Sequence, residues 1–346
     1  MSAVAENPSK ALDGLRGLAV LQVVIYHYYL LLPLTVDWYL LLRRLGSVID
    51  GLTLFFVLSG FLIGGILLDM RETPGMFRVF YWRRVCRILP LYFLLLATYG
   101  VVRAVDQHWK IGLLQYWFSE FPIWNYAVFW QNERMVRDVV IGAPWLAVTW
   151  SLAVEMQFYL IAPWVVRYVS RRTLIGLGAA CVLAGPFVRS DVRDYLLIDR
   201  LDALAAGVLV AALLRETAGA TLLARGRRVL RMLVVAHLLT IIVLRVADVT
   251  CPVLNSQTTT ALVYAVLLAL LVDGAAWTGW KPAIEAFAPF GLMSYFVYLF
   301  HMPVDYLFET FAPGAIAAKL PVTFTLAALS YRYFEQPLMK LGRRLL

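Results

Sequence analysis

Residues 52–69 read LTLFFVLSGFLIGGILLD, and the terminal Asp69 is their only charged side chain. A helix of roughly 20 apolar residues crosses the hydrocarbon core of a bilayer. Similar apolar runs recur along nearly the whole chain of 346 residues, of which 62% are hydrophobic and 15% charged, whereas a soluble domain carries about 25% charged residues. The sequence therefore predicts a membrane protein whose spans are helices, because lipid offers the backbone no hydrogen-bond partners.

The apolar runs predict an all-α transmembrane bundle with about ten spanning helices. The expected spans are 15–33, 52–69, 88–105, 145–166, 173–188, 197–214, 230–247, 258–275, 288–310 and 315–334. An eleventh apolar stretch near 111–130 contains Glu120, Pro122 and Asn125 and is rich in tryptophan, a residue that favours the membrane interface. We therefore expect this stretch to be interfacial or re-entrant.

Basic residues in the connecting loops predict the orientation, because cytoplasmic loops are enriched in Lys and Arg. The basic segments are 69–87, 167–172, 215–231 and 340–344. All four fall on one side only if 111–130 does not cross, which places both termini in the cytoplasm and 106–144 outside it. This pattern accounts for the net charge of +9 without nucleic acid as a partner.

Neither an internal repeat nor a long linker is evident, so residues 1–346 are expected to form a single domain. The chain has three cysteines, Cys86, Cys181 and Cys251, without paired spacing. Cysteines without paired spacing predict neither a disulfide framework nor a metal site.

Two ionisable side chains, Arg16 and His27, lie in the first apolar run, eleven residues apart. That separation is almost three helical turns, so both side chains are expected to face the same way, about 16 Å apart along the axis. Ionisable residues within a span are functional candidates. A cation at the cytoplasmic edge and an imidazole deeper in the same wall suit an anionic ligand and a general base. The alternative is a snorkelling arginine and a hydrogen-bonded packing histidine.

A second basic cluster, RRVCR at residues 83–87, precedes the third span. Arg84 and Arg87 are three residues apart and share one helical face. Guanidinium groups bind phosphate through paired hydrogen bonds, so this pair is a candidate phosphate site. On the residues alone, a positive-inside anchor is the simpler interpretation.

Glu155 is an ionisable residue in the fourth predicted span. Together with Ser151 and Tyr159 it forms a stripe at four-residue intervals on one helical face. The carboxyl is a candidate to hold a substrate hydroxyl or the imidazole, or else a structural group bonded to neighbouring helices. Ser59 and Gly60 in the second span predict close helix packing rather than a nucleophile.

Seven segments, in this order, resemble the acyltransferase family 3 membrane proteins, which include O-acetylases of lipopolysaccharide, peptidoglycan, exopolysaccharide and sugar-bearing antibiotics. The segments are LDGLRGLAVLQVVIYH (12–27), LFFVLSGFLI (54–63), FYWRRVCRILPLY (80–92), TWSLAVEMQFYLIAP (149–163), RLDALAAGVLVA (200–211), SYFVYLFHMPV (294–304) and YRYFEQP (331–337). Each is short and apolar, but seven in the family's order cover nearly the full chain.

The family's arginine–histidine pattern falls on Arg16 and His27, and its cytoplasmic arginine pair falls on Arg84 and Arg87. The resemblance implies that His27 is catalytic and that the arginines bind the acyl-CoA donor.

Two positions depart from the family's pattern. Thr53 stands where many members have an acidic residue, and Asp50 lies three residues earlier, so the carboxylate partner of His27 stays open. In the tail motif, Gln336 stands where an arginine is common, and we expect little consequence. With no hydrolase-like extension evident, the stand-alone form of the family is expected.

These features predict a multi-pass O-acyltransferase of the bacterial inner (cytoplasmic) membrane. It is expected to move an acyl group, most simply acetyl, from acyl-CoA to a carbohydrate or glycoside hydroxyl. His27 is the expected general base and Glu155 a second catalytic candidate, while Arg16, Arg84 and Arg87 are expected to bind the donor. The thiolate is a good leaving group, so no metal or further cofactor is required.

The main alternative is a transporter of acyl groups or sugars, in which intramembrane charges are common. The lack of a detectable repeat and the concentration of a titratable pair in one helix weigh against it. A membrane scaffold or sensor is a third interpretation, which would not require His27.

The predicted topology is tested by reporter fusions. A reporter at Ser170 should be cytoplasmic and one at Arg137 external, because the basic loops orient the helices. A cytoplasmic signal at Arg137 would mean that 111–130 crosses the membrane.

Overall fold

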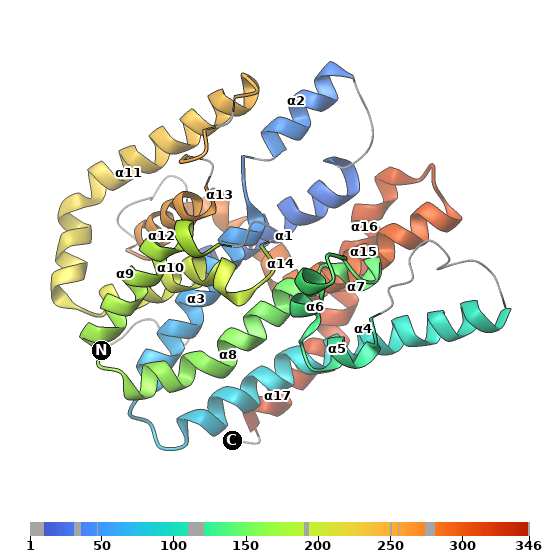
Figure 1. Ribbon diagram of the computed structural model, residues 1–346, viewed down its shortest axis with the longest axis horizontal. Coiled ribbons are helices and arrows are strands. Elements are labelled where there is room, and N and C mark those ends of the chain that lie inside the picture. The colour runs from blue at the N-terminus through green and yellow to red at the C-terminus, as the bar shows by residue number, and fades with distance from the viewer. Residues whose placement is uncertain are drawn as a thin grey trace. The chain divides into compact units, whose positions relative to one another are not determined.

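The computed structural model describes residues 10–30, 36–46, 48–109, 121–189, 194–249, 251–254, 256–273 and 281–344 (Figure 1). Every regular element in these ranges is a helix, which confirms the predicted all-α class. Packing divides the chain into two compact units, each assembled from separate segments. Because the units interleave along the chain, the single-domain assignment stays a prediction.

Unit 1 comprises residues 1–72, 161–189 and 198–292. Its helix α1 packs against α3, α13 and α14, and α12 packs against α3 and α11. The elements of this unit are α1 (Lys10–Ile25), η1 (Tyr26–Leu30), α2 (Asp37–Gly46), α3 (Gly51–Met70), α9 (Arg171–Val188), α10 (Leu197–Leu213), α11 (Thr217–Val246), α12 (Gln257–Val272), α13 (Lys281–Glu285) and α14 (Ala288–Leu292).

Unit 2 comprises residues 73–160, 190–197 and 293–346. Helix α15 packs against α4, α7 and α16, and α17 packs against α4. Helix α8 (Trp150–Tyr168) begins in this unit and ends in unit 1. The other elements of unit 2 are α4 (Met76–Trp109), α5 (Ile123–Ala127), α6 (Gln131–Arg137), α7 (Pro144–Ala147), α15 (Ser294–Phe311), η2 (Ile316–Ala318), α16 (Lys319–Ser330), η3 (Tyr331–Glu335) and α17 (Gln336–Arg344).

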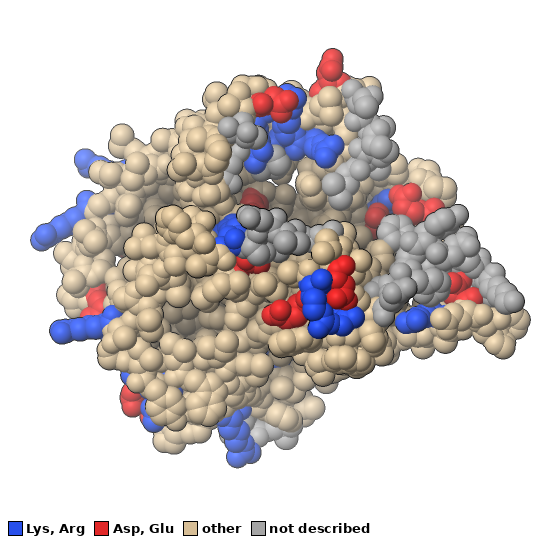
Figure 2. Space-filling view, viewed as in Figure 1, with Lys and Arg blue, Asp and Glu red and all other residues tan. Residues whose placement is uncertain are grey.

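In the described part of the chain, five helical stretches are long and apolar enough to cross a membrane, and α12 is apolar but shorter. Figure 2 shows that most atoms on the visible face belong to residues other than Lys, Arg, Asp and Glu. The membrane-helix class is confirmed, whereas the count of ten spans stays a prediction. The five stretches are Tyr39–Met70, Met76–Trp109, Pro144–Tyr168, Arg171–Val188 and Thr217–Val246.

Several predicted boundaries differ from the structure. Helix α4 begins at Met76, well before the predicted start at residue 88. The prediction followed hydropathy, which the arginines before residue 88 lower, but arginine is a good helix former and the helix includes them. The predicted span 288–310 is divided into α14 and α15. Of the predicted interfacial stretch near 111–130, residues 111–120 lie outside the described part, and the remainder contains the short helix α5.

Glycines let the helices of unit 1 approach closely. A Cβ atom added at Gly60 of α3 would overlap the carbonyl oxygen of Leu204 in α10, and one added at Gly207 would overlap that of Val57. Lipid supplies no hydrophobic force between helices, so such small-residue contacts hold membrane bundles together. The predicted packing role of the Ser59–Gly60 pair agrees with this contact.

Gly60→Ala is expected to lower the thermal unfolding midpoint of the detergent-solubilised protein. The new methyl group must displace the Leu204 backbone, and overpacking of this kind costs about 1–3 kcal/mol. Gly176→Ala in α9 is the matched control, since an added Cβ there meets nothing within 4 Å. Equal midpoints for the two variants would contradict the packing role of Gly60.

Candidate active site

Arg16 and Asp13 form an ion pair in the first turns of α1, with 3.2 Å between Nη1 and Oδ1. Both side chains are mostly buried. The backbone around them is fixed by glycine contacts, because a Cβ at Gly14 would overlap the Ile284 carbonyl and one at Gly17 that of Phe287. Arg16 therefore lies in the part of α1 that packs closely against α13 and α14.

His27 lies in η1, a π-helical turn that continues α1. Its Nδ1 lies 2.8 Å from the carbonyl oxygen of Val23. A carbonyl oxygen only accepts, so Nδ1 carries the hydrogen and the neutral ring has its lone pair on Nε2. This tautomer suits a general base that acts through Nε2.

The π-helical turn also affects the prediction that Arg16 and His27, eleven residues apart, face the same way. A π-helix is wider than an α-helix and is found frequently at functional sites. The α-helical spacing counted from Arg16 holds as far as Ile25, where α1 ends. The direction of His27 is therefore set by η1 rather than by the α-helical repeat.

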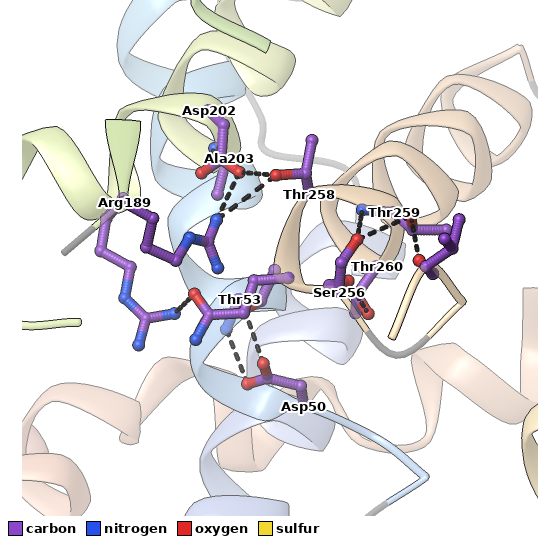
Figure 3. Close-up of polar contacts among 12 residues, drawn as sticks. Asp50, Thr53, Arg189, Asp202, Ala203, Ser256, Thr258, Thr259 and Thr260 are labelled. Atoms are coloured by element: carbon purple, nitrogen blue, oxygen red, sulfur yellow. Dashed lines mark hydrogen bonds and ion pairs between the residues drawn. The ribbon is translucent and has the colours of Figure 1, made fainter. Parts of the chain in front are cut away.

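Asp50 caps the start of α3. Its carboxylate accepts hydrogen bonds from the Thr53 backbone N at 3.0 Å and from the Thr53 hydroxyl at 2.6 Å (Figure 3). Gln22 of α1 accepts from the backbone N of Gly51 at 3.0 Å, which ties the cap to the helix that leads to His27. A carboxylate therefore stands beside the Thr53 side chain, while the carboxylate partner of His27 stays open.

A buried charge network joins α9, α10 and α12 (Figure 3). The Asp202 side chain is 2% exposed and accepts hydrogen bonds from Arg189 at 2.7 Å and from the Thr258 hydroxyl. Arg200 donates to Gln257 and lies 5.9 Å from the Phe56 ring centroid. Sequence analysis used Arg200 and Asp202 only as part of the segment 200–211, although two charges at the start of an apolar span were a visible signal.

In unit 2, the predicted residues Arg84 and Glu155 lie close together. The Arg84 guanidinium lies 5.7 Å from the ring centroids of Phe80 and Tyr159. The Tyr159 hydroxyl donates a hydrogen bond to the buried Glu155 carboxylate, and both groups interact electrostatically with Arg84. The predicted stripe along α8 thus meets the basic start of α4.

The Nε–H of Arg84 is buried and has no hydrogen-bond partner among the described residues. An unsatisfied buried donor costs about 1–3 kcal/mol, more when it is charged. Arg87 follows one turn later on α4 and is half-buried. Two guanidinium groups on one helical face, one with an unused donor, form a candidate binding site for an anion.

Other polar groups of unit 2 are hydrogen-bonded to one another. The Ser151 hydroxyl pairs with that of Tyr298 on α15, which also donates to the Val148 carbonyl at 2.6 Å. Gln131 has no exposed surface, and its amide donates to the Thr149 carbonyl at 2.9 Å. Apart from Ser151, sequence analysis missed these residues.

The five predicted site residues therefore fall into two groups. Arg16 and His27 belong to unit 1, whereas Arg84, Arg87 and Glu155 belong to unit 2. Their catalytic and binding roles stay predictions. The described residues contain no group of three or more His, Cys, Asp or Glu side chains placed to hold a metal ion.

Residues 9–331 match the family model described as the acyltransferase domain. The chain belongs to the acyltransferase-domain family. This confirms the predicted resemblance and the predicted enzyme class, an acyltransferase.

Several bacterial proteins are similar to this family member. It is 27% identical to the peptidoglycan O-acetyltransferase OatA of Listeria monocytogenes, over 96% of this chain and 56% of the relative. It is 28% identical to a putative peptidoglycan O-acetyltransferase, YrhL, of Bacillus subtilis, over 96% and 55%. It is 25% identical to a putative O-acetyltransferase of Staphylococcus aureus strain COL, over 96% and 57%.

The chain spans a little over half the length of these relatives. No solved structure matches this chain.

Proposed function

We propose that this protein is a membrane O-acyltransferase that transfers an acyl group, most simply acetyl, from acyl-CoA to a carbohydrate hydroxyl. The family match over residues 9–331 carries this proposal. The names of the relatives support O-acetyl transfer and a carbohydrate acceptor, because peptidoglycan is a glycan polymer. The family match does not favour the transporter alternative.

The donor side of the proposal rests on the arginines. Arg84 and Arg87 of unit 2 are proposed to bind the phosphates of acyl-CoA, while the donor-binding role of Arg16 stays a prediction. The buried, unpartnered Nε–H of Arg84 supports a phosphate ligand. Glu155 is proposed as a positioning residue, because it interacts electrostatically with Arg84 and accepts a hydrogen bond from Tyr159.

The proposed chemistry is direct transfer with one base. The acceptor oxygen attacks the thioester carbonyl carbon, so a C–O bond forms as the C–S bond breaks. The hydroxyl proton passes to Nε2 of His27, which its Nδ1–H bond to Val23 leaves as the basic nitrogen. The departing thiolate takes a proton from the imidazolium and restores the neutral base.

The location follows from the same proposal. The protein lies in the cytoplasmic membrane with both termini in the cytoplasm, which brings the donor arginines to the compartment that contains acyl-CoA. Five helical stretches of sufficient length support the membrane location, and the distribution of basic loops supports the orientation of the termini.

Arg84→Ala and Arg87→Ala should each weaken acyl-CoA binding about ten- to a hundred-fold, the usual loss for a charge-assisted hydrogen bond. Isothermal titration of the purified protein with acetyl-CoA measures the effect. The neighbouring Arg83 has an exposed side chain, so Arg83→Ala is the matched control. Unchanged affinity in the first two variants, with altered topology in all three, would make these arginines membrane anchors.

His27→Ala should lower acetyl transfer about 10²–10⁴-fold, the usual effect of losing a positioned general base. His27→Gln should be almost as inactive, because glutamine keeps polarity but takes no proton. Release of free CoA upon addition of peptidoglycan fragments measures the rate at matched membrane-protein levels. His237→Gln in α11 is the control.

A packing histidine predicts the reverse order, with glutamine tolerated and alanine harmful through lower yield. Near-normal turnover in His27→Gln would remove this residue from the mechanism. Absence of acceptor-dependent CoA release in the wild type would remove the proposed function itself.

A further inference from the structure

Glu335 is a buried carboxylate to which the mechanism above gives no role. It ends η3, the second π-helical turn in the described chain, and only 7% of its surface is exposed. The Ser330 hydroxyl donates a hydrogen bond to its Oε1 at 3.0 Å. Burial raises the pKa of Glu335 to about 7, so the group is charged above neutral pH, where a nearby cation favours its charged form.

That cation is Arg87, which lies within electrostatic range of Glu335. Tyr295 of α15 interacts electrostatically with both residues, and its hydroxyl donates to the carbonyl of Ile88, the residue after Arg87, at 2.8 Å. Three elements of unit 2, α4, α15 and η3, therefore bring Glu335 to the arginine cluster.

The packing of the following helix fixes this position. Helix α17 packs along α4, and a Cβ added at Gly342 would lie 2.7 Å from Cβ of Cys86. Glu335 immediately precedes α17, so the contact at Gly342 anchors the carboxylate with respect to α4.

Glu335 acts on Arg87 through its electric field rather than through a direct ion pair. Among the described residues, the Glu335 carboxylate and the Arg87 guanidinium are not within the 4.0 Å of an ion pair. The carboxylate therefore lowers the positive potential around Arg87 without occupying its N–H donors.

We infer that Glu335 is the counter-charge that limits the affinity of the arginine site for coenzyme A. This inference rests on the proposed donor site. Acyl-CoA and the product CoA carry the same phosphates, which are remote from the reacting carbonyl. Arginines that bind those phosphates hold substrate and product equally, and such uniform binding does not speed the chemical step. Above neutral pH, the negative charge of Glu335 beside Arg87 weakens this hold and lets CoA leave.

Glu335→Gln tests the inference, because glutamine keeps the shape and an acceptor for Ser330 but removes the charge. Removal of one negative charge from a partly desolvated anion site should tighten binding of both CoA and acetyl-CoA about three- to tenfold. Isothermal titration at pH 8 in detergent measures both constants, and product inhibition by CoA should strengthen in parallel. The direction of the change in affinity is diagnostic, since a merely structural defect would weaken CoA binding.

Two further variants make the test decisive. Ser330→Ala removes the hydrogen bond but keeps the carboxylate. At pH 9, well above the pKa of about 7, the group stays charged, so this variant should not tighten binding. In the Arg87→Ala background, the effect of Glu335→Gln should disappear, because the two residues act on the same charge balance.

Unchanged or weaker CoA binding in Glu335→Gln, at normal yield and unfolding midpoint, overturns the inference and leaves the donor site standing. The inference is also overturned if Glu335→Gln still tightens CoA binding in the Arg87→Ala background. If Arg87→Ala itself leaves CoA binding unchanged and uncoupled from Glu335, the donor site of the proposed function fails as well.

Discussion

The core of a bilayer offers no hydrogen-bond partner to a polar group, and the structure follows from that constraint. Helices satisfy their own backbones, and the polar side chains within them turn toward one another. Asp202 is enclosed by Arg189 and Thr258, and Glu155 receives the Tyr159 hydroxyl. These two buried carboxylates are compensated within their own units, and the surface visible in Figure 2 is largely uncharged.

Helix identity could be predicted from the sequence because the length of an apolar run is a local property. Helix limits could not, since hydropathy marks where lipid ends rather than where hydrogen bonding ends. Helix α11 begins at Thr217, within a basic segment that the hydropathy of the run excluded. The π-helical turns at 26–30 and 331–335 also escaped prediction, because their residues have no distinct composition.

Some residues of the candidate site could likewise be predicted from the sequence, and others could not. A charge inside an apolar run is conspicuous, and this signal identified His27 and Glu155, whereas Arg84 was identified by the basic cluster that precedes the third predicted span. Buried amides are not conspicuous, so Gln131 was missed although it has no exposed surface. Pairings between distant segments, such as Ser151 with Tyr298, depend on which helices become neighbours, and one sequence does not contain that information.

The interleaving of the two units has a consequence for biosynthesis. Chains emerge from the ribosome N-terminus first, and domains generally fold in that order. Helix α4 and the first part of α8 are made long before residues 293–346, which complete unit 2. The newly inserted chain therefore holds Arg84 and Glu155 in an unfinished unit until α15–α17 arrive, and a chaperone or insertase that shields them during that interval would raise the yield of active protein.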